Sequence, residues 1–305
     1  MTSVSEIPED RLAAAPARPA ILMPPPQRSR AMEMLIEHPT LWIGAALLAV
    51  MVAVAICAPL VATADPGALN PAMRVKSPSA EAWFGTDMLG RDIYSRTVYG
   101  ARVSLVVGAG VAIFASVVGL AIGVLSGFVR WADNIVMRVM DGLMSIPAIL
   151  LAIALMTLMR GGSVFNVILA ITIAEIPRVA RLTRSVVLSV REQPYVEAGT
   201  ACGTSTLGII WRHIMPNTLA PLTVQATYIC ASAMITEAIL SFIGAGTPTA
   251  IPSWGNIMAE GRALWQVKPN VVFFPALFLS VAVLAVNLLG DGLRDAVDPR
   301  LAKQV

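Results

Sequence analysis

The chain of 305 residues is 56% hydrophobic and only 13% charged. Together with a mean hydropathy of +0.73, this composition excludes a soluble globular domain and indicates a membrane protein with several spans. The net charge of +3 does not indicate a nucleic-acid partner, because most of the arginines flank apolar stretches, where anchoring at a cytoplasmic membrane surface explains them.

Residues 1–31 contain many Ala and Pro residues, several acids and no long apolar run. This composition predicts a disordered tail, which we expect in the cytoplasm. The tail does not resemble a signal peptide, because Glu6, Glu9 and Asp10 occupy the place of a basic leader and no apolar core follows them. The following residues, 32–303, are expected to form one transmembrane domain in the lipid bilayer.

Apolar stretches in this domain predict an all-α polytopic protein with six transmembrane helices, since one crossing needs about 20 apolar residues. The expected spans are residues 41–64, 103–129, 142–159, 163–184, 219–243 and 271–289. Pro147 interrupts the third span and is expected to kink it. The uncharged part of the fourth span is short, because Glu175 and Arg178 follow, and the helix is expected to continue out of the membrane.

Small residues recur at every fourth position in the second span, and they include Gly119, Gly123 and Gly127. Such a stripe lets two helix backbones approach closely in lipid. We therefore expect tight packing against another helix. Packing inside the chain and packing across a subunit boundary are equally consistent with the pattern.

A polar stretch, residues 185–217, lies between the fourth and fifth spans. In its central part, residues 195–216 (called the elbow below), a short helix can begin at Pro194 and end at Gly203 in a left-handed conformation. The residues after Gly203 predict a second helix. A rigid, mostly polar helix–Gly–helix elbow suits contact with a soluble partner better than burial in lipid.

The second helix of the elbow is expected to be capped by Thr204 or Ser205. Its apolar residues recur at helical spacing and predict one buried face, made of Leu207, Ile210, Trp211 and Ile214. Pro216 is expected to end this helix, because proline has no N–H and its ring clashes with the preceding turn.

Arginine and lysine are more frequent on the elbow's side of the membrane than on the other side, which predicts a cytoplasmic elbow and cytoplasmic termini. The loop after the first span nevertheless carries five basic residues on the opposite side: Arg74, Lys76, Arg91, Arg96 and Arg102. The sequence offers no physical account of this excess.

Glu197-Ala198-Gly199, Gly203 and Ile214-Met215-Pro216 resemble the EAA loop of ABC-importer permeases, with the Glu-to-Gly and Gly-to-Pro spacings of that pattern. Three positions depart from it, where Ala, Ile and Leu are usual: Gly199, His213 and Met215. Further stretches are similar to the C-type permease subunit of dipeptide and oligopeptide importers, and they include residues 85–92, 252–255 and 287–300.

By this resemblance, the chain is one of two permease subunits of an importer in the bacterial inner membrane. The resemblance implies three kinds of partner: a homologous permease in a heterodimer, two cytoplasmic ATPase subunits and an external solute-binding protein. ATP and Mg²⁺ would act on the ATPases, with no cofactor or metal in this chain. Contact with an ATPase would involve Glu197, Ala198, Gly203, Arg212, His213 and Pro216. Peptides are the expected cargo, with nickel chelates, glutathione and opines as alternatives within the same branch.

No catalytic chemistry is expected in the chain itself. The phosphate-binding Gly-Lys-Ser/Thr sequence of an ATPase is absent, and His38 and His213 lie in no metal-ligand or nucleophile pattern. These observations argue against a membrane-embedded enzyme. A transporter driven by an ion gradient would be favoured by inverted repeats, broken helices or several intramembrane acids. Of these features, the sequence contains only Pro147, which can interrupt a helix, and Glu237, a single intramembrane acid.

Glu237 is the one acid well inside an otherwise uncharged stretch, where a charge costs about 2.5–3.5 kcal/mol. Two interpretations are equally consistent with the sequence. In the first, Glu237 lines a cavity on the transport pathway. In the second, it is a hydrogen-bonded or protonated residue that clamps neighbouring helices together.

Overall fold

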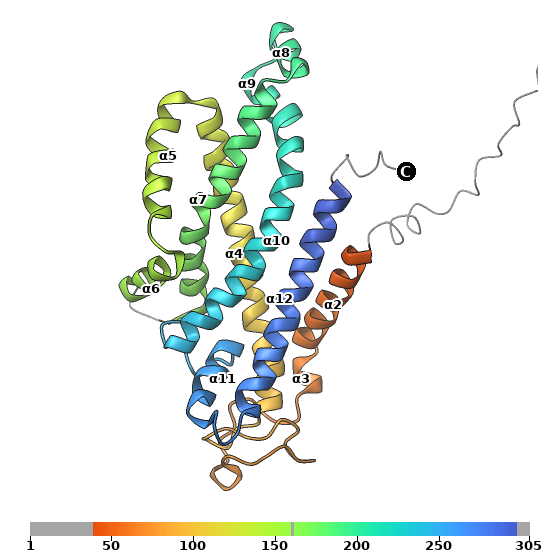
Figure 1. The fold of residues 1–305 in the computed structure, drawn as a ribbon, viewed down its shortest axis with the longest axis vertical. Coiled ribbons are helices and arrows are strands. Elements are labelled where there is room, and N and C mark those ends of the chain that lie inside the picture. Colours follow the sequence, from red (N-terminus) through yellow and green to blue (C-terminus); the bar gives the residue numbers. More distant parts are fainter. Residues whose placement is uncertain (1–38, 160–161, 298–305) are drawn as a thin grey trace, which may run out of the picture. The chain divides into compact units, whose positions relative to one another are not determined.

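The computed structural model describes residues 39–159 and 162–297. Within these residues the secondary structure is helical, with no strand beyond one bridge between Thr86 and Asp92. The expected tail, residues 1–31, lies outside the described residues. The helices in chain order are α2 (Pro39–Ile56), α3 (Ala58–Val61), α4 (Ile93–Phe128), α5 (Arg130–Met144), α6 (Ala148–Leu158), α7 (Val164–Arg191), α8 (Pro194–Ala201), α9 (Thr206–Ile209), α10 (Met215–Ile243), α11 (Trp254–Gly261) and α12 (Asn270–Val297), as labelled in Figure 1.

Four helical stretches among the described residues are long and apolar enough to cross a membrane: Pro39–Ile56, Ile93–Phe128, Thr206–Ile243 and Asn270–Ala296. Helices α5 and α6 make a fifth span only if the bent pair is counted as one. Helix α7 has 28 residues and carries Glu175, Arg178 and Arg181 along its middle. Length and composition thus identify four or five of the six expected spans.

The third expected span, residues 142–159, is not a single helix. Helix α5 begins twelve residues earlier, at Arg130, and ends at Met144, and α6 then departs at an angle of 95°. Pro147 stands at the start of α6 with an extended ψ of 129°. Because a proline disfavours helical backbone at the residue before it, the chain breaks here and does not merely kink.

Helix α4 is ten residues longer at its start than the expected second span, because Asp92 caps it by accepting a hydrogen bond from the Ser95 N–H. Its glycine stripe packs along α7 in the same chain. Cβ atoms added at Gly119, Gly123 and Gly127 would lie no more than 2.5 Å from side-chain atoms of Val179, Thr183 and Val187. The three glycines are therefore occupied by an intramolecular contact, and a second subunit has no room to reach them.

Pro216 does not end the second elbow helix, contrary to the expectation from the sequence. The helical run continues from Thr206 to Ile243. Its residues Ile210–Ile214 form a π turn, in which the Met215 N–H donates to the Ile210 carbonyl five residues back. The wider turn accommodates the ring of Pro216, the second residue of α10.

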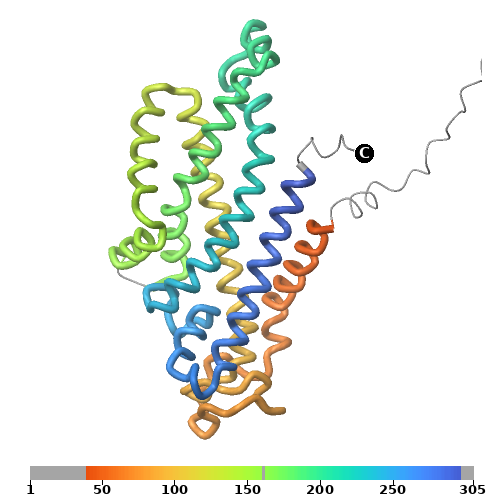
Figure 2. Tube along the Cα trace, viewed as in Figure 1, coloured from red at the N-terminus to blue at the C-terminus, as the bar shows by residue number. Residues whose placement is uncertain are grey.

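Helices α2, α4, α10 and α12 pack side by side through small residues. The backbone of α12 approaches Gly44 of α2 so closely that a Cβ there would overlap it, and Gly108 of α4 lies against Met234 of α10. Buried residues from all four helices form one apolar cluster, which includes Met51, Ala101, Met234 and Val286. Figure 2 traces the chain along α7 to the elbow and back along α10, so the elbow joins two long helices of the bundle.

Candidate functional site

The elbow projects beyond the other described helices, at the turn between α7 and α10 (Figure 1). Its first helix, α8, ends in a complete Schellman motif. The Gly203 N–H donates to the Thr200 carbonyl (3.0 Å), and the Thr204 N–H donates to the Gly199 carbonyl (3.1 Å). Gly203 has a φ of +83°, in the left-handed region that the sequence predicts. Local hydrogen bonds thus set the angle at which α8 leaves the turn.

Ser205 caps α9 by accepting a hydrogen bond from the Gly208 N–H, so Ser205 rather than Thr204 is the cap. The predicted buried face of this second helix is wrong for Leu207 and Trp211, which are each 69% exposed, and it is confirmed for Ile214, which is buried. The residue buried beside Ile214 is Ile209. Their spacing of five residues follows from the π turn, which shifts the helical phase by one residue.

A small apolar cluster attaches the elbow to the end of α7. It contains five buried side chains: Val187, Val190, Val196, Ile209 and Ile214. Val196 belongs to α8 and Ile214 to the π turn that precedes α10. Side-chain packing therefore connects the elbow to the adjoining ends of both long helices.

The predicted coupling residues lie on the elbow but do not form one contiguous group. Glu197 and Ala198 are exposed on α8, and Arg212 is exposed on the π turn. His213 is half-buried, and its ring lies 5.8 Å from that of Tyr195. Pro216 is exposed and has the structural role described above. Two apolar side chains that the sequence placed inside, Leu207 and Trp211, are part of the exposed surface of the elbow.

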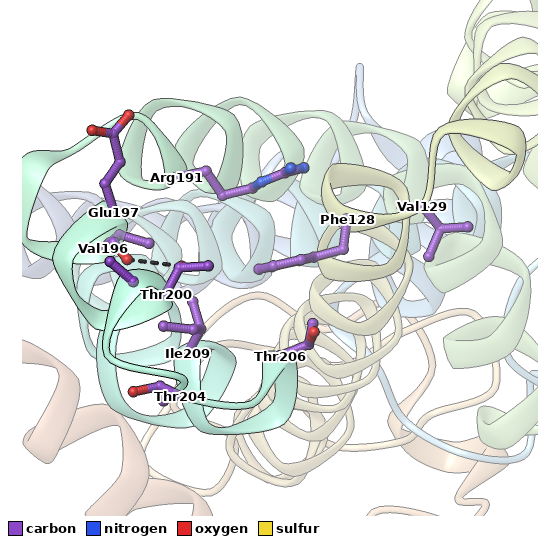
Figure 3. A pocket seen from close by; sticks show the side chains of 10 residues that line it. Phe128, Val129, Arg191, Val196, Glu197, Thr200, Thr204, Thr206 and Ile209 are labelled. Atoms are coloured by element: carbon purple, nitrogen blue, oxygen red, sulfur yellow. Dashed lines mark hydrogen bonds between the residues drawn. The ribbon is translucent and has the colours of Figure 1, made fainter.

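A groove of about 620 Å³ separates the elbow from the junction of α4 and α5 (Figure 3). Its lining includes Phe128, Arg191, Thr200 and Thr206. Arg191 closes one side, because its guanidinium lies 5.0 Å from the centre of the Phe128 ring and donates to the Gly127 carbonyl. Glu197 of α8 also lines the groove, and its carboxylate points away from Phe128 (Figure 3).

Glu237 lies at the centre of a buried hydrogen-bond network and is fully inaccessible to solvent. Its carboxylate accepts hydrogen bonds from Ser241 (2.8 Å), Ser104 (3.3 Å) and Thr247 (3.4 Å). Thr247 in turn accepts from the Asn256 amide of α11 (2.9 Å). The network joins α4, α10, α11 and the loop after α10, which favours the helix clamp over the pathway lining.

This clamp predicts the behaviour of two substitutions at one position. Glu237→Gln keeps an acceptor oxygen, and the surrounding hydroxyls can turn to accept from the new amide. We expect it to alter the import rate modestly and to leave the ranking of substrates unchanged. Glu237→Ala leaves several buried hydroxyls without a partner, at about 1–3 kcal/mol for each one, and is expected to lower protein yield.

The measurement is uptake of short peptides, glutathione and a nickel chelate with one unchanged binding protein. A Glu237→Gln variant that reordered these substrates would show that Glu237 selects cargo.

Three of the five basic residues that the sequence left unexplained, Arg91, Arg96 and Arg102, make contacts that hold distant segments of the chain together. Arg96 is only 2% exposed and lies 3.4 Å from a carboxylate oxygen of Asp87 and 3.0 Å from one of Glu260. Arg91 pairs with the same two acids. Arg102 donates to the Ala55 carbonyl (2.5 Å) at the end of α2. Glu260 follows both arginines by more than 160 residues, so no local sequence signal reveals this cluster.

Comparison with known proteins identifies the family. Residues 116–303 match the model of the binding-protein-dependent transport system inner membrane component. The probable peptide ABC transporter permease protein y4tQ of Sinorhizobium fredii is 52% identical over 264 residues, which cover 87% of this chain and 90% of that protein. The dipeptide transport system permease protein DppC of Alkalihalophilus pseudofirmus is 41% identical over 260 residues, 85% of each chain.

The glutathione transport system permease protein GsiD of Pectobacterium atrosepticum is 40% identical over 227 residues, which cover 74% of this chain and 75% of that protein. Among solved structures, an inward-facing MetNI methionine ABC transporter matches with a TM-score of 0.55 and 21% identity, over 68% of this chain and 98% of the other. This likeness concerns the fold alone. The chain belongs to the family of inner membrane components of binding-protein-dependent transport systems.

Proposed function

We propose that this chain is a permease subunit of an ABC importer that carries peptides across the bacterial inner membrane. In this proposal the chain crosses the membrane six times, with the bent pair α5–α6 counted as one crossing and α7 as the crossing that composition alone does not identify. Its partners are a homologous permease, two cytoplasmic ATPases and an external solute-binding protein. ATP hydrolysis takes place on the ATPases, and no catalytic step is assigned to this chain.

The geometry of the elbow is the observation that carries the proposal. Helix α8 is held rigidly by the Schellman motif and by the apolar cluster at the end of α7. The helical run from Thr206 continues without a break into α10. When a bound ATPase moves α8, the displacement therefore reaches two long helices together. A change in ATPase contacts between two states then shifts the equilibrium between outward- and inward-facing bundles.

Peptides are the favoured cargo because several similar permeases carry peptide, dipeptide or oligopeptide in their names. Glutathione is a second candidate, supported by the similarity to glutathione permeases. Both cargoes are short, zwitterionic peptides in chemical terms, so one passage can serve either. The external binding protein is expected to make the choice.

Co-purification and reconstitution test the proposal. The tagged chain is expressed with the subunits encoded beside it, purified and inserted into liposomes with ATP enclosed. Retained ATPase chains and peptide uptake that requires both ATP and the binding protein are expected. Uptake that proceeds without ATPases and collapses with the proton or sodium gradient would establish a secondary transporter in place of an importer.

The proposed orientation gives a separate prediction for Cys202, which is exposed on the elbow. With Cys57 and Cys230 replaced, a membrane-impermeant thiol reagent is expected to label Cys202 in inside-out vesicles and not in intact spheroplasts. The reason is that a cytoplasmic elbow reaches the reagent only when the inner face is exposed. Labelling of Cys202 in spheroplasts but not in inside-out vesicles would show that the elbow faces the outside.

A further inference from the structure

Ionisable side chains from two helices, with a neighbouring tyrosine, form an exposed row on one side of the bundle. Arg178 and Arg181 project from α7, and their side chains are 41% and 51% exposed. Asp141 of α5 is 62% exposed, and Tyr228 of α10 is 54% exposed. Helix α7 contacts both α5 and α10, so the row runs across three adjacent helices.

The proposed six-span topology places the row within the thickness of the membrane. At 1.5 Å per residue, Arg178 is about 21 Å along α7 from Val164, and Tyr228 is about 22 Å along α10 from Ile243. Val164, where α7 starts, and Ile243, where α10 ends, both lie at the end of the bundle remote from the elbow, and the hydrocarbon core is about 30 Å thick. Arg178 and Tyr228 are therefore placed in the half of the core nearer the elbow.

Contacts inside the row do not remove its charges from the surface. The Arg178 Nη1 donates to Glu175 (3.0 Å), and the guanidinium lies 5.4 Å from the centre of the Tyr228 ring. The Arg181 Nη2 donates to Asp141 (2.5 Å). Each guanidinium has five N–H donors, so these contacts occupy only a part of its capacity. Lipid cannot satisfy the remaining donors, and charged groups at such depth face water or protein.

We propose that this row lines the water-filled passage of the importer and contacts the charged ends of the peptide as it crosses. The inference rests on the proposed function and adds the residues and the chemistry of the contact. Arg178 and Arg181 meet the terminal carboxylate, and Asp141 meets the terminal ammonium group. The row contains two cations and, with Glu175, two acids, so its net charge is zero. A zwitterion therefore finds partners for both ends without being held firmly at either.

Thiol accessibility tests whether the row faces water. In a cysteine-free background, Arg178→Cys is compared with Val117→Cys, an exposed position of α4. The two positions lie at similar depth, because Gly119 packs directly against Val179. A small charged thiol reagent is expected to label Arg178→Cys in the reconstituted ATP-free complex and to label Val117→Cys much more slowly. Equal, slow labelling of both positions would show that the row faces lipid or a protein contact and would overturn the proposal.

Transport stoichiometry tests the contact with cargo. Arg178→Gln is expected to lower peptide uptake several-fold while ATP hydrolysis stimulated by the binding protein stays near the parent value, so more ATP is consumed for each peptide. Arg178→Lys, which keeps the positive charge, is expected to restore part of the uptake. If uptake and stimulated hydrolysis fall together, or if the lysine variant behaves like the glutamine variant, Arg178 has a structural role only.

The two proposals fail in different ways. If the cysteine-free parent complex imports no peptide under any condition, the proposed function is wrong. If the parent imports peptide but Arg178→Cys stays unlabelled, or Arg178→Gln leaves the ratio of ATP to peptide unchanged, only the inference about the row is wrong.

Discussion

A Gly203→Val variant is expected to reach the membrane in near-normal amount but to import no peptide. Gly203 has a φ of +83°, and a left-handed residue with a side chain costs about 1–2 kcal/mol, with a β-branched residue among the least tolerant. Relief of that strain requires loss of the hydrogen bonds that join Gly203 and Thr204 to the end of α8. Helix α8 then leaves the turn at a different angle, and its contact with the ATPase is lost. ATP-dependent uptake and ATPase retention on purification are the measurements.

Gly244 supplies a matched control for this experiment. It ends α10 with a φ of +90°, and a Cβ at either glycine would meet nothing within 4 Å. Gly244→Val therefore carries the same backbone strain at a position outside the elbow, and it is expected to retain ATPase subunits. Gly203→Asn, which tolerates the left-handed conformation, is expected to keep most of the uptake. Normal transport by Gly203→Val would show that the elbow is not the coupling device.

The second large effect is expected from Gly123→Ala, which adds one methyl group where α4 meets α7. The new Cβ would lie 2.5 Å from the Thr183 Cβ and 2.7 Å from the Ala180 carbonyl oxygen, so the helices must separate. Overpacking of this kind costs about 1–3 kcal/mol. A lower melting temperature of the purified complex in detergent and a lower yield from the membrane are the expected results.

Gly142→Ala is the matched substitution for Gly123→Ala. Both glycines lie within helices, and alanine is favoured over glycine in a helix by about 1 kcal/mol at either position. A Cβ at Gly142 would meet nothing within 4 Å, so this variant is expected to be as stable as the parent or more so. Equal melting temperatures for the two variants would mean that α4 and α7 are packed less tightly than their glycines indicate.

Much of the organisation follows from sequence alone, because it depends on local chemistry. Apolar length and composition predict the membrane helices, and the Pro194 and Gly203 positions predict the first elbow helix and its left-handed end. The small-residue stripe predicts a close helix contact. Each of these features depends on residues that are close together in the sequence: a helix cap, a turn or a run of apolar or small side chains.

Tertiary structure decided the features whose partners are far apart in the chain. The glycine stripe could have served a second subunit, and only the position of Val179 and Thr183 assigns it to α7. Arg96 is accounted for by Glu260, which follows it by more than 160 residues. Glu237 is assigned as a helix clamp because Ser104 of α4 donates a hydrogen bond to its carboxylate.

Two of the wrong predictions, the stop at Pro216 and the buried position of Trp211, have one cause. A π turn inserts one residue into the helix before Pro216, and this insertion both admits the proline ring and rotates the following side chains. Helical periodicity read from a sequence assumes one phase throughout, and an inserted residue changes that phase. The composition of the chain thus determined that it is a bundle of membrane helices with a polar elbow. Packing between distant segments decided which faces are buried, because that depends on which helices meet.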